Sequence, residues 1–420
     1  MDTIKLLSQR VYTWGANSYG QLGQGNCEDL LEPQSVDNTL PIGDVRSLVG
    51  GGGHSVLLTE AGELFVCGQN HKGQLGLGHA IDVTSFHLCA LPVQKAVHQV
   101  SCGWDFTLIL TDDGQVLSCG SNAYGQLGLP HIAGHAAEPL HIQTLTEPVI
   151  SVAAGLRHSL AVTGSGHVYQ WGTGLSSQAK RALSPHPVPA HLVSMEPCPV
   201  PGLDHVTPCK VAAGASHCVC LTAAGDLFVW GSNKQGQLGN TGTFIPQPML
   251  LDCTVMGGET VTEIWSGWTH LVAKTDSGRV FSWGRSNYGQ LGRPVLGSQS
   301  SRLESGNPTA EDSILLACIP VEVKTLSGVT QIACGSEHNL AIVGGCLLSW
   351  GWNEHGMCGD GSTTDITQPQ PIPALRDARP LLIGCGAGHS MALCLVSGNQ
   401  AKHPQESTTS PEKRTFPTKD

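Results

Sequence analysis

The side chains whose type and spacing could support chemistry in this sequence are six histidines, each of which ends a Gly-x-x-His phrase. An imidazole can bind a metal ion or exchange a proton near neutral pH. These histidines, however, each belong to a different copy of a long repeat, so they cannot converge on one ion. We therefore predict that they form structural hydrogen bonds and that the chain binds no metal. They are His54, His158, His217, His270, His338 and His389.

The sixteen cysteines are the second set of reactive side chains. Cys67 and Cys119 stand where other copies of the repeat have a tryptophan, and Cys102, Cys334 and Cys385 each precede a glycine. This placement is typical of small buried residues in a reducing compartment rather than of disulfides. No Cys-x-x-Cys pair occurs, so a zinc site has little support.

The glycine-rich phrase that alternates with Gly-x-x-His is better explained as a turn than as a ligand site. Residues 14–23 read WGANSYGQLG. Near-copies begin at Cys67, Cys119, Trp230 and Trp283. Glycine allows positive φ, asparagine tolerates left-handed backbone, and Leu22 is the one side chain of the phrase that can reach a core. No Lys-Ser/Thr pair follows GQLG, so we predict neither a phosphate loop nor nucleotide binding.

The two phrases define a repeat that predicts the fold. With Phe106 in the histidine slot of a seventh copy, successive slots are 52, 52, 59, 53, 68 and 51 residues apart. Within one unit, FTLIL and QVLSC are short apolar strands, and TDDG between them is a hairpin turn. Seven such units predict an all-β, seven-bladed β-propeller of four-stranded blades. Strand direction also predicts that the GxxH and GQLG loops share one face.

The two ends of the array are incomplete in complementary ways. RVYTWG at residues 10–15 is a last strand with no partner before it, whereas GAGHSMALCLV at 386–396 begins a blade that no WG strand completes. We therefore predict that the N-terminal strand pairs with the C-terminal blade and closes the ring. The predicted organisation is a short N-terminal tail (1–10), the propeller (11–396) with insertions at 173–204 and 293–317, and a disordered tail (397–420).

Composition argues against several classes of function. The chain has 420 residues, of which 53 are glycine, and a net charge of −11, whereas nucleic-acid binding depends on clustered Lys and Arg. We therefore expect no DNA partner. No apolar run is long enough to span a bilayer, and MDTIKLLSQR lacks the apolar segment of a secretory signal. We expect a soluble monomer without membrane insertion, located in the cytoplasm, with the nucleus as an alternative.

The alternating phrases WGxNxxGQLG and GxxHxLAL resemble the repeat of the regulator of chromosome condensation family, whose fold is a seven-bladed propeller. The resemblance covers residues 11–396 and rests on fourteen instances of the two phrases. AAGLRHSLAVT, IWSGWTHLVA, CGSEHNLAIVGG and SWGWNEHGMCGDG are similar to members of the family that act in secretion. The resemblance implies guanine nucleotide exchange on a small GTPase in vesicle traffic, without covalent chemistry or a cofactor. It also suggests a component of the exocyst tethering complex as a partner.

The resemblance also implies where a partner binds, because acidic residues in GxxH-type loops and an inserted element after a WG strand contact the GTPase in the founding member. The slot before the histidine position holds Asp105 and Glu337, and it holds Arg157 in another copy. The fourth WG phrase has lost both its Asn and its GQLG, so the segment 173–204, with Lys180 and Arg181, is the candidate inserted element. Its sequence and its place in the order differ from those of the founding member.

Aromatic residues in these loops complete the candidate site, because exposed aromatics often anchor partners. Trp104 and Trp268 are either such anchors or inter-blade packing residues, and Asp105 is either a turn residue or a partner contact. The remaining candidates are Trp352, Glu354 and His355 in WGWNEHG. A plant ultraviolet photoreceptor of the family clusters its loop tryptophans on neighbouring blades, whereas Trp104 and Trp268 fall on separated ones, so light sensing is disfavoured.

Three functions stay open at this point. The first is an exchange factor or effector-like regulator of a small GTPase, which acts through the GxxH/GQLG face. The second is a scaffold that binds secretion-machinery proteins and catalyses nothing. The third, supported by the family name alone, is a chromatin-associated exchange factor.

Overall fold

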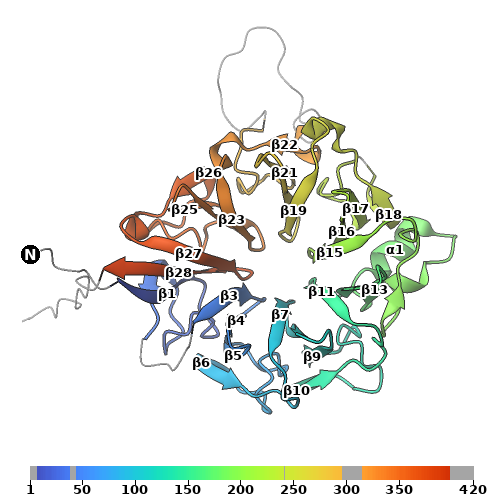
Figure 1. Ribbon diagram of the computed structural model, residues 1–420, viewed down its shortest axis with the longest axis horizontal. Helices are drawn as coiled ribbons and strands as arrows, with labels where there is room; N and C mark the ends of the chain where they lie inside the picture. Colours follow the sequence, from blue (N-terminus) through green and yellow to red (C-terminus); the bar gives the residue numbers. More distant parts are fainter. Residues whose placement is uncertain (1–6, 38–43, 241, 296–314, 398–420) are drawn as a thin grey trace, which may run out of the picture.

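The structure, a computed structural model, describes residues 7–37, 44–240, 242–295 and 315–397. Its strands form seven four-stranded antiparallel sheets arranged as blades around a central axis (Figure 1). The prediction of an all-β, seven-bladed propeller is therefore confirmed. The predicted tail beyond Ser397 and the middle of the second insertion, residues 296–314, lie outside the described residues.

Each blade places its first strand innermost and its fourth strand outermost, except that blade 7 combines the two ends of the chain. Blade 1 contains β3 (Val45–Gly50), β4 (His54–Thr59), β5 (Leu64–Gly68) and β6 (Val83–Cys89). Blade 2 contains β7 (Val97–Cys102), β8 (Phe106–Thr111), β9 (Val116–Ser121) and β10 (His135–His141). Blade 3 contains β11 (Val149–Ala154), β12 (Ser159–Thr163), β13 (Val168–Trp171) and β14 (Cys198–Pro199). Blade 4 contains β15 (Pro208–Ala213), β16 (His217–Thr222), β17 (Leu227–Ser232) and β18 (Phe244–Leu250).

The remaining elements complete the ring. Blade 5 contains β19 (Val261–Ser266), β20 (His270–Thr275), β21 (Val280–Gly284) and β22 (Val321–Glu322). Blade 6 contains β23 (Val329–Cys334), β24 (His338–Val343), β25 (Cys346–Gly351) and β26 (Ile366–Pro371). Blade 7 contains β27 (Arg379–Cys385), β28 (His389–Ser397), β1 (Leu7–Gly15) and β2 (Leu30–Ser35). The helical segments include α1 (Ser176–Leu183) and four short 3-10 turns, η1 (Ala190–Leu192), η2 (Cys253–Met256), η3 (Lys324–Leu326) and η4 (Pro373–Leu375).

The ring closes in blade 7 as predicted. Strand β1 pairs with β28 along its whole length, from Leu7 opposite Ser397 to Gly15 opposite His389. One boundary differs from the prediction, because β1 begins at Leu7 and residues 7–10 were assigned to an N-terminal tail. The difference arises because β28 extends to Ser397 and offers ladder hydrogen bonds to residues 7–10, whose sequence LSQR shows no apolar alternation of its own.

The GQLG phrase forms a compact turn with one apolar plug, as the first copy illustrates. Gly20 and Gly23 have φ of 79° and 66°, and Leu22 is fully buried. Asn17 does more than tolerate an unusual backbone: its side-chain oxygen accepts a hydrogen bond from Leu22 N at 3.0 Å, and its Nδ2 donates to Glu28 O at 2.9 Å. The buried amide therefore fixes both ends of the loop, which explains why the asparagine recurs.

The same phrase connects neighbouring blades. The indole N–H of a WG strand donates to a backbone oxygen in the turn of the preceding blade, as Trp171 does to Gln126 O at 2.9 Å and Trp14 to Met357 O at 2.9 Å. Blade 3 has lost the phrase, and there Trp230 of blade 4 donates to the side-chain oxygen of the buried Gln170 at 2.7 Å. A side chain has replaced the missing loop as the acceptor.

The six repeated histidines form structural hydrogen bonds, as predicted. Each is fully buried, and its Nε2 contacts a group of the next blade, as His54 does with Thr107 Oγ1 at 2.9 Å and His389 with Ser55 Oγ at 2.7 Å. The first glycine of each phrase makes room for the ring, since a Cβ at Gly51 would lie 2.2 Å from His54 Cε1. These contacts run in one direction around the propeller, and Phe106 interrupts them in blade 2.

The first insertion contains helical structure that was not predicted from the sequence. Residues 173–204 contain α1, η1 and the two-residue strand β14, and Ala179 of α1 and Leu192 of η1 are buried in the core. The stretch SSQAKRAL contains several good helix formers, but eight residues are too short a run to show a clear helical period in the sequence.

The cysteines of the chain are unpaired and mostly buried or half-buried. All sixteen cysteines are free thiols, and only Cys27 and Cys346 are exposed, which agrees with the predicted role as small packing residues. In the described ranges, no group of three or more His, Cys, Asp or Glu side chains is placed to hold a metal ion. Within the same ranges, no helix is long and apolar enough to cross a membrane.

Candidate partner-binding face

The GxxH and GQLG loops lie on one face of the propeller, as strand direction predicted. In six of the seven blades, the residue that follows the WG or CG pair donates its backbone N–H to the carbonyl of the residue before the histidine slot. Ser121 N binds Asp105 O at 2.9 Å, and Trp352 N binds Glu337 O at 2.9 Å. The two loops of each blade are thus joined at their base, and their side chains point out of the same surface, here called the GxxH/GQLG face.

Side chains on this face meet at the seams between blades. The residue before GQLG in one blade approaches the residue before the histidine slot in the next. Tyr124 of blade 2 lies under the Arg157 guanidinium of blade 3, whose Cζ is 4.4 Å from the ring centroid. At the seam between blades 1 and 2, Lys72 is one of the cations that surround Asp105. The arrangement gives the face a mixed cationic, acidic and aromatic character over blades 1 to 3.

Asp105 is a partly buried carboxylate among cations. Burial raises the pKa of Asp105, while Lys72, a hydrogen bond from Ser121 and the Arg157 charge act in the opposite direction. The Asp105 carboxylate is thus stabilised by Lys72, Ser121 and Arg157, and it still lies at the surface. It can accept a further donor from a partner, provided that the partner displaces water there.

Trp104 and Trp268 lie on separated blades, 2 and 5, yet they touch. Their rings make an edge-to-face contact with centroids 5.5 Å apart, which is a favourable geometry for two indoles. The contact spans the mouth of the central channel, where the innermost loops of opposite blades come close. Trp104 still exposes 39% of its surface, so it serves as a packing residue and presents an apolar edge to solvent.

Glu337, in contrast, uses its carboxylate inside the protein. The side chain is almost fully buried and accepts hydrogen bonds from Thr269 Oγ1 at 2.7 Å and from Gln290 Nε2 at 2.7 Å, with Arg285 Nη1 at 3.5 Å. Thr269, Gln290 and Arg285 all belong to blade 5, so Glu337 holds the seam between blades 5 and 6. Its role as a direct partner contact stays a prediction, and the geometry favours a positioning role.

The remaining candidates of blade 6 form an aromatic group at its outer side. The Trp352 ring lies 6.1 Å from Tyr288 and 5.8 Å from His355, measured between centroids. His355 Nδ1 is 2.9 Å from Asp29 Oδ2 of blade 7, and Glu354 beside it is exposed. These side chains continue the GxxH/GQLG face across blades 5 to 7.

Comparison with known proteins agrees with this architecture. The sequence pattern of the RCC1-like domain matches residues 10–392, which is nearly the whole propeller. The chain belongs to the RCC1-like domain family. A protein of Bos taurus named secretion-regulating guanine nucleotide exchange factor is 49% identical over 404 residues, which are 96% of this chain and 87% of the relative.

Solved structures show the same RCC1-like fold. Human WBSCR16 superimposes with a TM-score of 0.75 at 25% identity and covers 92% of this chain and 99% of its own. Prp20p of Saccharomyces cerevisiae, in a structure reported together with its binding to Gsp1p and histones, has a TM-score of 0.75 at 23% identity and covers 93% and 92%. These two structural similarities show that the chain shares its fold with both proteins.

Lys180 and Arg181 lie apart from the other candidates of the RCC1-like face. Both belong to α1, which replaces the GQLG turn after β13 and packs beside β18 of blade 4 (Figure 1). Arg181 lines a cavity of about 250 Å³ together with Lys234 and Phe244. The structure therefore brings eight of the ten candidates to the loops of the face and places these two at the rim.

One class of surface residue in the RCC1-like repeat was not recognised from the sequence, although one of its members, His355, was among the predicted candidates. The position immediately before GQLG, or its variant, points out of the face in every blade that keeps the phrase. It holds Tyr19, Lys72, Tyr124, Gln235, Tyr288 and His355. The signal was present as a variable position inside an otherwise constant phrase, which is the pattern expected of a surface site on a fixed scaffold.

Proposed function

We propose that this RCC1-like propeller is a guanine nucleotide exchange factor, or an effector-like regulator, of a small GTPase that it binds through the GxxH/GQLG face. The observation that carries the proposal is the contiguous patch of Trp104, Asp105, Tyr124 and Arg157 on that face. The name of the relative in Bos taurus, at 49% identity over 96% of this chain, supports a role in regulated secretion.

Exchange on this face needs no acid, base or nucleophile. A factor that binds the nucleotide-free GTPase more tightly than the loaded form shifts the equilibrium toward nucleotide release by its difference in affinity. The patch suits such binding, because Trp104 offers an exposed indole edge that is already fixed by Trp268. Asp105 and Arg157 beside it offer charges of opposite sign, so a partner must match both the apolar centre and the charges.

Release of labelled GDP from a panel of small GTPases, followed by stopped-flow fluorescence, tests the proposal. We expect this protein to accelerate release from at least one of them. Trp104→Ala and Asp105→Ala are each expected to reduce the acceleration at least about thirtyfold, which corresponds to about 2 kcal/mol of lost binding. Asp112→Ala is the matched control, since Asp112 is an exposed carboxylate in the hairpin at the other end of the same blade.

The outcomes separate the proposal from its alternatives. If no GTPase responds and a secretion-machinery protein such as an exocyst component is bound by the same face, the protein is a scaffold. Equal activity of Asp112→Ala, Trp104→Ala and Asp105→Ala would place the site elsewhere, and the α1 cations Lys180 and Arg181 would then be the next residues to change. The cytoplasm, with the nucleus as an alternative, remains the proposed location.

A further inference from the structure

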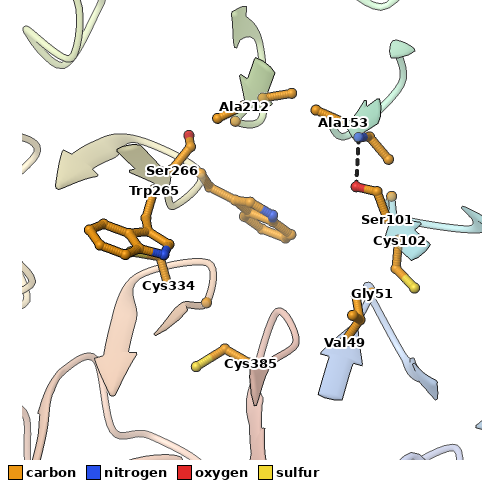
Figure 2. Close-up of a pocket in the computed structure, with 18 of the residues that line it drawn as sticks. Val49, Gly51, Ser101, Cys102, Ala153, Ala212, Trp265, Ser266, Cys334 and Cys385 are labelled. Carbon is orange, nitrogen blue, oxygen red and sulfur yellow. Dashed lines mark hydrogen bonds between the residues drawn. The ribbon is translucent and has the colours of Figure 1, made fainter. Parts of the chain in front are cut away.

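The central channel of the propeller contains a cavity that shares Trp104 and Trp268 with the proposed GTPase-binding face and extends inward from it. It has a volume of about 260 Å³ and is lined by the innermost strands of all seven blades. Figure 2 shows Trp265 and Ser266 on one side of this cavity and Ala153 and Ser101 on the other. At the end on the GxxH/GQLG face, the contact between Trp104 and Trp268 lies over it.

Trp265 breaks the repeat inside the channel. Trp265 lies on the innermost strand of blade 5 and pairs with Val272, the second residue after His270. In every blade, one residue of the innermost strand pairs in the same way with the second residue after the histidine slot. The equivalent residues in the other six blades are all small or medium in size. They are Val49, Ser101, Ala153, Ala212, Ala333 and Gly384. Val49, Ser101, Ala153 and Ala212 line the cavity together with Trp265, so the one indole faces small side chains across the cavity.

Lys210 brings a single charge into this cavity. Among the described residues that line it, Lys210 is the only charged one, and its ammonium lies 5.6 Å from the centroid of Trp265. Burial lowers the pKa of Lys210, and Glu263 opposes this effect. The Glu263 carboxylate, however, is 3.2 Å from Lys274 Nζ. Within the part of the chain that the structure describes, no group accepts a hydrogen bond from the Lys210 ammonium.

We propose that the central channel binds a small planar organic anion, with its carboxylate or phosphate at the Lys210 ammonium and its ring against the indole of Trp265. An ammonium that has lost part of its hydration gains most from an oxyanion, because a charge-assisted hydrogen bond is stronger than a neutral one. The small residues opposite Trp265 leave room for a flat ring to lie on the indole. The volume is below the roughly 300 Å³ at which sites for drug-sized ligands begin, so a single-ring ligand fits the site best.

Isothermal titration calorimetry of the full chain tests this site with benzoate, phenyl phosphate and inorganic phosphate as probes. We expect at least one of the two aryl anions to bind with 1:1 stoichiometry at millimolar concentrations, and inorganic phosphate alone not to bind. Lys210→Met keeps the aliphatic stem and removes the charge, so it is expected to weaken binding by about tenfold or more. Lys324→Met, at an exposed lysine outside the channel, is the matched control and is expected to bind normally.

A second variant keeps the test decisive if Lys210→Met folds poorly. Trp265→Ala introduces the residue that blades 3, 4 and 6 carry at this position, and it is expected to abolish binding of the aryl anion while the melting temperature stays within a few degrees. Absence of saturable binding of both aryl anions to the unmodified protein would overturn the proposal. So would equal binding by Lys210→Met and Lys324→Met, or binding of inorganic phosphate as tight as that of phenyl phosphate.

Discussion

Lowering the pH through about 5 is expected to unfold the propeller in one cooperative transition, because six buried histidines are neutral in the folded chain and take up protons on unfolding. Burial lowers the pKa of His54, His217 and His338 to about 3 and that of His158 and His389 to about 4. It also lowers the pKa of His270, where the Glu337 carboxylate opposes the effect.

The sign and size of this effect follow from the two states. In the unfolded chain a histidine titrates near 6.5, so the stabilisation is complete above that pH and is lost as the pH falls toward the folded values. Each histidine costs about 1.4 kcal/mol of stability per pH unit below 6.5. The five histidines with a folded pKa of about 3 or 4 together cost about 7 kcal/mol per unit, which is comparable with the whole stability of a typical domain, about 5–15 kcal/mol.

Denaturant unfolding followed by tryptophan fluorescence at a series of pH values measures the expected slope. His158→Phe copies the residue that blade 2 already has at position 106 and removes one titrating group, so the number of protons bound on unfolding should fall by about one. His98→Gln, at an exposed histidine outside the six repeated slots, is the control for the effect of the substitution itself. A free energy of unfolding that stays constant between neutral pH and about pH 5 would contradict the assignment of these histidines as neutral and buried.

Deletion of residues 1–15 is expected to lower the melting temperature by at least about 10 °C. The deletion removes β1, whose Trp14 is fully buried in the core between blades 6 and 7 and whose Val11 packs against blade 1. Loss of a buried tryptophan alone costs about 3–5 kcal/mol, and the backbone ladder to β28 and β2 is lost in addition. Differential scanning fluorimetry of the two proteins is a sufficient measurement.

Two comparisons make this prediction specific to strand pairing. Deletion of residues 1–6 leaves the whole of β1 in place and is the control, which is expected to leave the melting temperature unchanged. A synthetic peptide of residues 7–15, added to the protein that lacks them, should restore part of the loss, because β28 and β2 keep the complementary edges. An unchanged midpoint after the longer deletion would contradict the importance of the shared blade.

The repeat made the fold and its closure predictable from the sequence. The residues around positions such as Leu22 and His54 recur in most copies of the repeat, so the role of each position could be inferred from these neighbours. The incomplete strand at residues 10–15 could be matched to the incomplete blade at 386–396, because a ring leaves no other place for either. The spacing of the repeated phrases was therefore enough to predict the number of blades, the closure of the ring, the shared loop face and the structural role of the histidines.

Features that depend on three-dimensional distance could not be found in this way. The contact of Trp104 with Trp268 joins blades that are far apart along the ring and meet only across its axis. The burial of Glu337 depends on Gln290 and Thr269 of the preceding blade, which its own phrase does not reveal. Trp265 could have been noticed as the one large residue in its slot, but only after the innermost strands had been aligned through their irregular pairing.

The histidine contacts described above link each blade to the next, and they are weakest at the two seams of blade 3. Blade 2 offers Phe106 instead of a histidine, and His158 of blade 3 reaches only the backbone oxygen of His217, at 3.3 Å. A closed ring loses its cooperativity first where its links are weakest, so local opening is expected to be unequal around the propeller. Blade 3, which carries Arg157 and the α1 insertion, is then the segment where brief local opening is expected most often, below the global cooperative transition.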